Sequence, residues 1–234
     1  MKNILIIGAA GDVGQGMVAQ FLSAGHRVLA TGRNVPRLEA LRSRFAADAP
    51  LDILPGDIVN EASAAALREA AIERLGTLDA VIAAVAAPHQ QRSLDTITAD
   101  EFAELFRHNV LTHFVAAKTF LPVIEAAGLY LSIGGGMADL LVPRAGHVGV
   151  CAAAQRRLFL TLAAEFGARV RVRELMIYSV VAGASNRAKA RAEWLTDEEI
   201  GRYAVAIFER PGHFVEPIVK LQSRQQLQID AQQA

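Results

Sequence analysis

A chain of 234 residues that is 52% hydrophobic is long enough to bury a sizeable core, in one large α/β domain or two small ones. Its 24 basic and 24 acidic residues balance, so no overall field attracts nucleic acid or an anionic membrane, and we expect neither as a partner. A single cysteine, Cys151, excludes an internal disulfide. Because we find no charged leader and no membrane-length apolar run, we expect a cytoplasmic protein.

Short apolar runs alternate with segments of helical period, which is typical of repeated strand–helix–strand units around a parallel sheet. We expect strands at 3–7, 27–31, 51–54, 80–85, 129–133 and 170–177. We expect helices near 13–24, 36–47, 61–75, 99–126, 148–166 and 196–208, the last with Thr196 as its N-cap. No linker divides the chain, so we predict a single α/β domain over residues 1–234. A polar tail at 222–234 is expected to be frayed or docked on a partner.

The first predicted strand runs directly into glycines and then into a helix opening. Residues without a Cβ allow a tight turn, and the free N–H groups and the dipole of a helix N-terminus attract phosphate. The Gly-x-x-Gly-x-x-Gly spacing is looser than the usual dinucleotide fingerprint, but its place between strand and helix supports one. We therefore predict that this turn binds a dinucleotide pyrophosphate; the alternative is a mobile turn without a ligand. The residues concerned are Gly8, Gly11, Asp12, Val13 and Gly14.

The end of the second predicted strand bears on the choice of cofactor. An acid there would bind the ribose hydroxyls of NAD and repel the extra phosphate of NADP. The sequence has Ala-Thr-Gly-Arg at 30–33 instead, and the guanidinium of Arg33 can hold a phosphate, with Arg37 as a second cation. We predict NADP(H) in preference to NAD(H). The alternative is that Arg33 only caps a surface turn.

Several motifs, in this order, resemble the short-chain dehydrogenase/reductase family. They are Ile-Ile-Gly-Ala-Ala-Gly-Asp-Val-Gly at 6–14, Ala-Thr-Gly-Arg at 30–33, Gly-Asp-Ile at 56–58, Leu-Asp-Ala-Val-Ile at 78–82, Asn109-Val110, and Leu-Ala-Ala-Glu-Phe at 162–166. The resemblance covers nearly the whole chain. It implies a doubly wound Rossmann fold, with a mostly parallel seven-stranded sheet and helices on both faces. It also implies a nicotinamide cofactor, and a homodimer or homotetramer formed through two long central helices.

The resemblance also assigns residues at the adenine end of the cofactor. It implies that Asp57 contacts the adenine amino group, that Ile58 covers the adenine ring and that Ala84 lies against the cofactor. Gly-Asp is also an ordinary turn with a helix-capping aspartate, and that alternative stays open.

The chain departs from the family where the proton is transferred. Counting back from Leu-Ala-Ala-Glu at 162–165 places the family's tyrosine at Val148, its lysine at Ala152 and its serine at Gly135. Positions 131–155 contain no tyrosine and no lysine, so a shifted register does not restore the pattern. Asn109 alone matches a family catalytic residue. The alternative is an ordinary helix asparagine that binds a nearby backbone carbonyl.

Two other residues could replace the missing tyrosine. His147 lies beside the vacant position with Cys151 one helical turn later, so both could face a nicotinamide. The alternatives are a surface histidine and a core cysteine. Tyr178, after the sixth predicted strand, offers a displaced phenol. The glycines at 134–136 remove side chains from the floor of the site, which makes room for a ligand or brings backbone amides close to it.

Two clusters of cations have more than one interpretation. Arg169, Arg171 and Arg173 alternate along a predicted strand, and we expect their face to be exposed to solvent. At 184–195, the position of the family's substrate loop, three cations and a tryptophan could receive an acidic substrate. A solvated face with one buried ring would have the same sequence.

Two classes of function stay open. The first is an NADP(H)-dependent oxidoreductase that acts on a carbonyl or alcohol, with candidate catalytic residues Asn109, His147 and Tyr178 and no metal. The second is a protein that binds NADP(H) without turnover, as a redox sensor or as the inactive partner of a catalytic subunit. Loss of the tyrosine, lysine and serine favours the second class, because general acid catalysis contributes about a hundred- to ten-thousand-fold in rate. The family resemblance favours the first, which we adopt.

Overall fold

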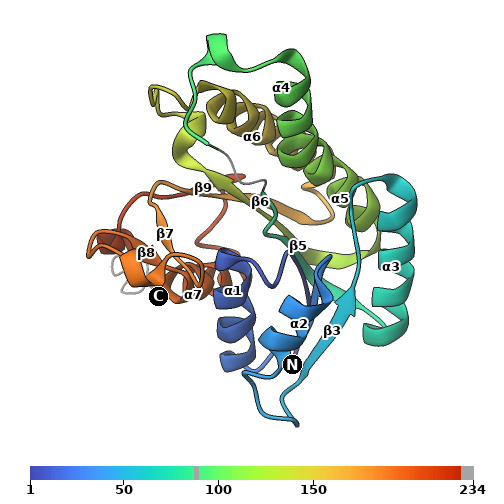
Figure 1. The fold of residues 1–234 in the computed structure, drawn as a ribbon. Coiled ribbons are helices and arrows are strands. Elements are labelled where there is room, and N and C mark those ends of the chain that lie inside the picture. Colours follow the sequence, from blue (N-terminus) through green and yellow to red (C-terminus); the bar gives the residue numbers. More distant parts are fainter. Residues whose placement is uncertain (87–89, 228–234) are drawn as a thin grey trace.

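One seven-stranded parallel sheet organises the protein, in a computed structural model that describes residues 1–86 and 90–227 (Figure 1). The strand order is β3-β2-β1-β4-β5-β6-β9, and every neighbouring pair in it is parallel. The strands are β1 (Asn3–Ile7), β2 (Arg27–Gly32), β3 (Leu51–Pro55), β4 (Leu78–Ala83), β5 (Ile124–Gly135), β6 (Arg171–Ile177) and β9 (Ile218–Leu221). The order reverses between β1 and β4, and such a switch point opens a crevice at the carboxyl ends of the strands. The predicted doubly wound Rossmann fold is confirmed.

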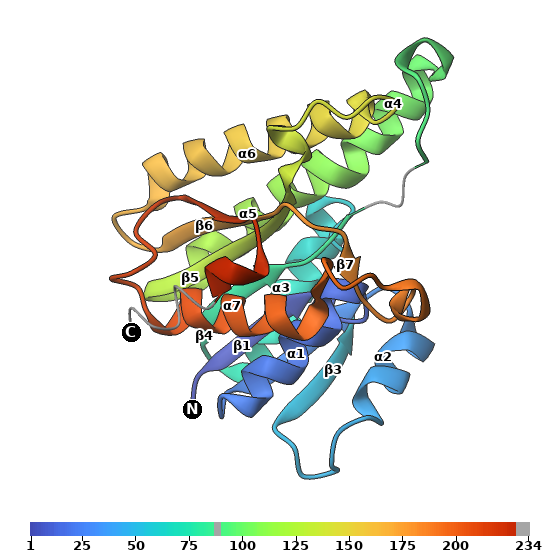
Figure 2. The same ribbon diagram turned by 90° about the vertical axis from the view of Figure 1, so that its left-hand side faces the viewer.

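Helices cover both faces of the sheet (Figure 2). One face carries α1 (Asp12–Ser23), α2 (Val35–Arg42) and α7 (Asp197–Glu209); the other carries α3 (Glu61–Leu75), α4 (Ala99–Phe106), α5 (Thr112–Phe120) and α6 (Gly146–Phe166). Alternate residues of β1 enter the two cores, with Ile4 and Ile6 in one and Leu5 and Ile7 in the other. Strands buried on both faces read as continuous apolar runs, which is why the sequence locates them well.

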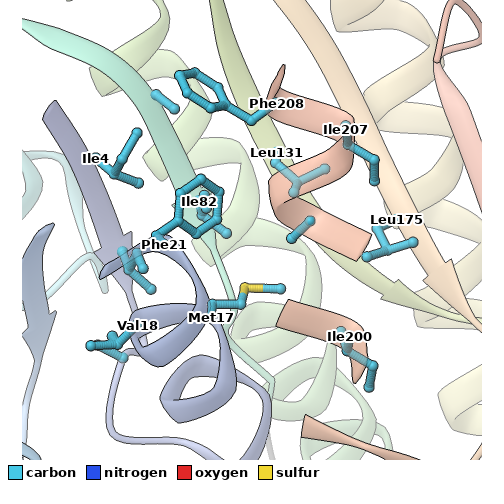
Figure 3. Packing of buried hydrophobic residues seen from close by; sticks show 14 of the residues in the cluster. Ile4, Met17, Val18, Phe21, Ile82, Leu131, Leu175, Ile200, Ile207 and Phe208 are labelled. Atoms are coloured by element: carbon cyan, nitrogen blue, oxygen red, sulfur yellow. The ribbon is translucent and has the colours of Figure 1, made fainter. Parts of the chain in front are cut away.

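Two helices far apart in the sequence share the first core. Figure 3 shows Met17 and Phe21 of α1 beside Ile207 and Phe208 of α7, over the strand residues Ile4, Ile82, Leu131 and Leu175. The N-cap of α7 is Thr196, as predicted: its hydroxyl accepts from the N–H of Glu199, and the Glu199 carboxylate accepts from the N–H of Thr196.

The predicted helix over 99–126 is confirmed from Ala99 to Phe120, with a π-helical turn in its middle, and is wrong at its end. The chain forms α4, a π-helical turn (Arg107–Leu111), α5 and a short 3₁₀ turn (Leu121–Val123), and then enters β5 at Ile124. Pro122 lies in that 3₁₀ turn; it lacks an N–H, and its ring clashes with the carbonyl four residues earlier, so an α-helix cannot pass through it. The helix expected at 36–47 is also shorter, ending at Arg42.

The expectation that the alternating arginines are exposed to solvent holds for Arg169 but is wrong for Arg171 and Arg173, which are half-buried. Arg171 donates to the carbonyls of Ala127, Ile207 and Phe208, and Arg173 donates to the carbonyl of Phe214. These bonds satisfy the last carbonyls of α7 and of the chain that follows it. A guanidinium offers five N–H donors, so one side chain can tie several carbonyls together.

Arg224 attaches the described start of the predicted tail. Residues 224–227 form a helical turn beside α7. The guanidinium of Arg224 attaches this turn, because it pairs with Glu199 and donates to the carbonyls of Ala192 and Trp194. Residues 228–234, the rest of that tail, lie outside the described residues. In the part of the chain that the structure describes, no helix is both long enough and apolar enough to cross a membrane.

Candidate functional site

The turn from β1 to α1 has the backbone that its glycines predict. Gly8 has φ +81°, and a Cβ there would overlap the carbonyl oxygen of Ala84. A Cβ on Gly14 would overlap the carbonyl oxygen of Gly8. Gly11 is the N-cap of α1 and brings no side chain to the first-turn N–H groups. The turn therefore presents backbone donors at a helix N-terminus, which suits a pyrophosphate.

Beside this turn lies a cavity of about 360 Å³ at the carboxyl ends of four strands. It brings together six of the predicted cofactor residues: Gly8, Gly11, Arg33, Asp57, Ile58 and Ala84. It is also lined by Ile7, Ala10, Gly32, Asn34, Arg37, Gly56, Val59, Val85, Ala86, His108 and Thr112. His108 and Thr112 were not predicted as site residues, because their place beside β4 depends on the packing of α5. Within the described chain, the cavity lining does not include Asp12, Val13 or Gly14.

Two arginines lie at the edge of this cavity. Arg33 is exposed to solvent, directly after β2. Arg37, in the first turn of α2, donates from Nη2 to the carbonyl of Ala10 at 2.8 Å, so its guanidinium spans from α2 to the glycine turn. Asn34 caps α2 by accepting from the N–H of Arg37 at 3.0 Å. The two cations flank the place where β2 ends without an acid.

Asp57 behaves as a turn residue within the described chain. One oxygen of its carboxylate accepts from the N–H groups of Ile58 at 2.7 Å and Val59 at 3.0 Å. This bonding holds the β3–α3 turn open at the cavity, and it agrees with the ordinary-turn interpretation. Ile58 is 5% exposed and presents an apolar wall there.

The side chain of Asp12 binds the loop that follows β6. Its carboxylate accepts from the backbone N–H of Ser185 at 2.9 Å and from the Ser185 hydroxyl. A Cβ on Gly183 would overlap the Asp12 side chain, so the loop packs directly against the first residue of α1. Only the backbone of Asp12 is thus available to the glycine turn.

Two of the three cations of the predicted substrate loop have acidic neighbours. Arg187 pairs with the buried Asp197 at 2.6 Å, and Arg191 lies 4.0 Å from Glu193. Burial raises the pKa of Asp197 from its ordinary value, and the charge of Arg187 opposes that rise. Trp194 is half-buried.

The three candidate catalytic residues occupy different environments, and none of them lines the cavity as described. Asn109 lies in the π-helical turn and donates from Nδ2 to the carbonyl of Leu105 at 2.9 Å. Single π-helical turns are frequent at functional sites. His147, the second residue of α6, is 5% exposed and shares a buried helix face with Cys151, whose thiol pKa is raised by burial. Both residues face the protein interior.

Tyr178 belongs to an ion cluster beside the end of β5. Its hydroxyl donates to Asp139, whose carboxylate also pairs with Arg156 and, at 2.7 Å, with Lys220. The Lys220 ammonium lies 5.8 Å from the centroid of the Tyr178 ring. A phenol and an ammonium therefore lie close together at the carboxyl edge of β6, although not at the positions where the family has its tyrosine and lysine.

The glycine run at 134–136 does not leave an open floor. A Cβ on Gly134 would overlap the Glu174 carboxyl group, and one on Gly136 would lie 2.5 Å from the Tyr178 ring. Beside Gly135 the nearest atom, the Met137 nitrogen, would be 4.0 Å away. The expectation of room for a ligand is therefore wrong at two of the three glycines, because side chains of β6 and the residue after it fill the space.

Glu174 is the buried acid of this region, at 1% exposure. Burial raises its carboxyl pKa from 4.5 to about 8, and the charge of Arg156 opposes that rise. No local motif around Glu174 indicates a buried acid. Across residues 1–86 and 90–227, no three His, Cys, Asp or Glu side chains are grouped so as to hold a metal ion.

Comparisons with known proteins agree with this architecture. The family model described as enoyl-(acyl carrier protein) reductase matches residues 8–208. A 1,2-dihydroxy-1,2-dihydronaphthalene dehydrogenase of a Ralstonia species is 26% identical over 238 residues, which cover 95% of this chain and 90% of that one. The protein of the same name in Pseudomonas putida is 32% identical over 125 residues, 52% of this chain and 48% of that one.

Solved structures show the same fold. The alcohol dehydrogenase from the archaeon Thermococcus sibiricus complexed with 5-hydroxy-NADP has a TM-score of 0.84 at 23% identity, covering 96% of this chain and 97% of that one. A short-chain dehydrogenase/reductase from Serratia marcescens has a TM-score of 0.82 at 18% identity, covering 94% of this chain and 96% of that one.

The matched span begins at Gly8 and ends at Phe208, so it includes the glycine turn, the lining of the cavity except Ile7, and all of α6. More than half of the chain is therefore matched by the family model, as its motifs predicted. The chain belongs to the short-chain dehydrogenase/reductase family of oxidoreductases, whose members bind a nicotinamide cofactor.

Proposed function

We propose that this protein is an oxidoreductase that uses NADP(H) in preference to NAD(H) to interconvert a carbonyl and an alcohol. The observation that carries the cofactor preference is the pair of guanidiniums, Arg33 and Arg37, at a cavity edge where β2 ends without a carboxylate. A guanidinium binds phosphate through charge-assisted hydrogen bonds, whereas a carboxylate there would repel it. The solved alcohol dehydrogenase of Thermococcus sibiricus, complexed with 5-hydroxy-NADP, has the same fold.

The described residues fit a dinucleotide along the cavity. The glycine turn provides backbone N–H groups for the pyrophosphate, and at Gly8 and Gly14 the backbone packs too closely for a Cβ, which keeps the turn tight. Ile58 offers an apolar surface to the adenine, and Asp57 lies beside it. Arg33 would bind the 2′-phosphate, and Arg37 would add a second cation without leaving the carbonyl of Ala10. When bound, the cofactor supplies or accepts the hydride.

Tyr178 is the proton donor that we propose first. Its phenol lies at the carboxyl edge of the sheet, is partly exposed, and has a hydrogen-bonded route through Asp139 to Lys220. His147 is the second candidate, and its burial requires that a substrate reach it beneath the start of α6. Asn109, held by the carbonyl of Leu105, would support the geometry of this region rather than carry a proton.

The relatives suggest a first substrate class. The Ralstonia and Pseudomonas proteins are named as dehydrogenases of 1,2-dihydroxy-1,2-dihydronaphthalene, a cyclic diol. We propose secondary alcohols on rings, and the matching ketones, as the first compounds to assay.

A binding protein without turnover is the second candidate function. The observation in its favour is that Val148, Ala152 and Gly135 occupy the positions of the family's tyrosine, lysine and serine. The filled space beside Gly134 and Gly136 points the same way. Such a protein would bind NADP(H) as a redox sensor or as the partner of a catalytic subunit.

A homodimer or homotetramer through the central helices is part of the proposal. Exposed apolar side chains lie on these helices: Leu111 and Phe114 on or beside α5, and Val150 and Leu160 on α6. Exposed apolar patches of this kind mark protein interfaces. A cytoplasmic location, and the absence of nucleic acid or membrane partners, stay predictions from the sequence.

A thermal-shift titration with NADPH, NADP⁺, NADH and NAD⁺ tests the cofactor. A ligand at a hundred times its dissociation constant adds about 2.7 kcal/mol to stability. We expect larger shifts with NADPH and NADP⁺. Arg33→Ala should weaken NADPH binding roughly 10- to 100-fold and leave NADH binding unchanged, while the exposed Arg202→Ala serves as the matched control. Equal wild-type shifts with both pairs would remove the role of Arg33.

Turnover is tested by NADPH consumption over a panel of aldehydes, ketones and quinones, and by cofactor reduction with cyclic alcohols. We expect Tyr178→Phe to lower kcat about a hundred-fold or more and to leave the NADPH dissociation constant unchanged. His147→Ala is assayed in parallel. Full activity in both variants would reject both donors, and tight NADPH binding with no turnover on any compound would favour the binding protein.

A further inference from the structure

We propose that His113, Ser132 and Gln155 are positioning residues that fix the backbone carbonyl of Val85 at the cofactor cavity. The inference rests on the proposed function, because its consequence is measured as cofactor binding. The chain of hydrogen bonds is continuous. His113 Nε2 lies 3.0 Å from the carbonyl oxygen of Val85, and His113 Nδ1 lies 3.2 Å from Ser132 Oγ.

Gln155 completes the chain. Its Nε2 amide donates to Ser132 Oγ and to the carbonyl of Ile133, both at 2.9 Å. Four elements are thereby linked, since Val85 follows β4, His113 is in α5, Ser132 is in β5 and Gln155 is in α6. His113 and Ser132 are 0% exposed and Gln155 is 6% exposed, so water does not compete for these bonds.

The chemistry of the groups sets which atom donates and which accepts in each of these hydrogen bonds. A carbonyl oxygen can only accept, so Nε2 of His113 carries the hydrogen that Val85 receives. Nδ1 is then an acceptor, the Ser132 hydroxyl donates to it, and the Ser132 oxygen accepts from Gln155. This arrangement requires a neutral imidazole. Burial lowers the pKa of His113 from 6.5 to about 4, with the Val85 bond opposing that fall, so the ring is neutral at physiological pH.

The histidine supplies a donor that the β4 segment itself lacks. Regular pairing of β4 ends at Ala83, and Ala84 makes one more bond, from its N–H to the carbonyl of Ile7 at 2.9 Å. The side chains at 83–86, Ala-Ala-Val-Ala, cannot form hydrogen bonds. His113 reaches this segment from α5, and its ring is kept in place by Phe159, with the ring centroids 6.0 Å apart and the planes at 86°.

The position of Val85 affects two parts of the cavity, its own wall and the glycine turn. Val85 lines it together with Ala84 and Ala86, and the Ala84 carbonyl packs against Gly8 of the glycine turn. A shift of Val85 would therefore move the cavity wall that residues 84–86 form, and would disturb the packing of the Ala84 carbonyl against Gly8. The link through Gln155 also fixes α6, two turns beyond His147, relative to that wall.

The experiment compares His113→Leu, His113→Gln and Ser132→Ala with Thr119→Val, a matched change of a buried polar residue on α5 that is not part of the cavity lining as described. The rate of backbone amide hydrogen exchange at residues 84–86 in the ligand-free protein measures how firmly this wall is held. Calorimetry measures the NADPH dissociation constant. We expect His113→Leu to speed exchange at 84–86 and to weaken NADPH binding about tenfold, the effect of one lost buried hydrogen bond. His113→Gln keeps a donor near Nε2 and should restore much of both, while Thr119→Val should change neither.

Three results would overturn the inference. Unchanged exchange in His113→Leu would show that the bond does not hold the wall. Faster exchange with an unchanged NADPH dissociation constant would show that these hydrogen bonds hold the segment but do not affect cofactor binding. An equal loss of affinity in Thr119→Val would show that the effect comes from lower overall stability. A wild-type protein that binds no nicotinamide cofactor would instead overturn the proposed function, and this inference with it.

Discussion

The carboxyl group of Glu174 occupies the space that a side chain on Gly134 would need. The two residues lie on neighbouring strands, with Glu174 opposite Ser132 in the β5–β6 register and Gly134 two residues further along. The glycine is required because the acid is buried, at 1% exposure, and packs against the backbone of β5. Gly134 directly precedes Gly135, the position at which the resemblance places the family's serine.

Gly134→Ala should destabilise the protein by about 1 to 3 kcal/mol, because the added methyl group has to displace the Glu174 carboxyl group. Gly135→Ala is the matched control, since a Cβ there meets nothing nearer than 4.0 Å, and we expect a change within about 0.5 kcal/mol. Urea denaturation at neutral pH measures both. Equal midpoints for the two variants would contradict the packing of Glu174 against Gly134.

The stability of the protein should fall as pH rises through the titration of Glu174. The carboxyl group titrates near its ordinary value of 4.5 in the unfolded chain and near 8 in the folded protein. Between these values the folded state holds the extra proton, so the contribution is complete below pH 4.5 and is lost as pH rises through 8. Glu174→Gln removes this dependence. It should be more stable than the wild type at pH 9, by an amount on the order of a few kcal/mol.

The matched control for this series is Glu165→Gln, a change of an exposed acid on α6. Urea midpoints between pH 5 and 9 give the comparison. A wild-type protein whose decline in stability above pH 6 is the same as that of Glu174→Gln would show that this carboxyl group does not retain its proton.

His113 should act in the opposite direction on the acid side. Its pKa is lowered to about 4 by burial, so the unfolded chain binds more protons than the folded protein between pH 6.5 and 4. Its contribution is complete above pH 6.5 and is lost as pH falls through 4. In a Glu174→Gln background, where the opposing titration is absent, adding His113→Gln should flatten the acid side of the stability curve. If the acid side of the stability curve did not change, the protonation would belong to a group other than His113.

The local sequence identified most of the parallel sheet and the cofactor end of the site. Apolar runs locate the central strands because both faces of each strand are buried. Gly8 and Arg33 were found because strand, glycine turn and helix follow one another directly in the chain, and the end of β2 lies beside that turn. Pro122 is a local signal for the end of this helix, and our prediction, which continued the helix to 126, did not use it.

The rest depended on which residues meet across the sheet. Glu174 and Gly134 are 40 positions apart, and only the register of β5 and β6 brings them together. His113 and Ser132 meet through the packing of α5, and neither residue carries a local motif. The glycines at 134–136 therefore looked like free space, because the side chains that fill it come from another strand.

Arg171 tests a tertiary contact that the local sequence did not predict, since the alternating pattern indicated a solvent-exposed residue. Its guanidinium donates to the carbonyls of Ala127, Ile207 and Phe208 at 3.0 to 3.2 Å, which joins β5 to the end of α7. Arg171→Met keeps the apolar stem and leaves the partly buried carbonyls of Ile207 and Phe208 without this donor, so we expect a loss of about 2 to 4 kcal/mol. Arg202→Met, on the exposed side of α7, should change stability by less than about 0.5 kcal/mol. Urea denaturation monitored by circular dichroism measures both. If the two variants unfolded at the same midpoint, Arg171 would be a solvated strand residue, as its alternating sequence first indicated.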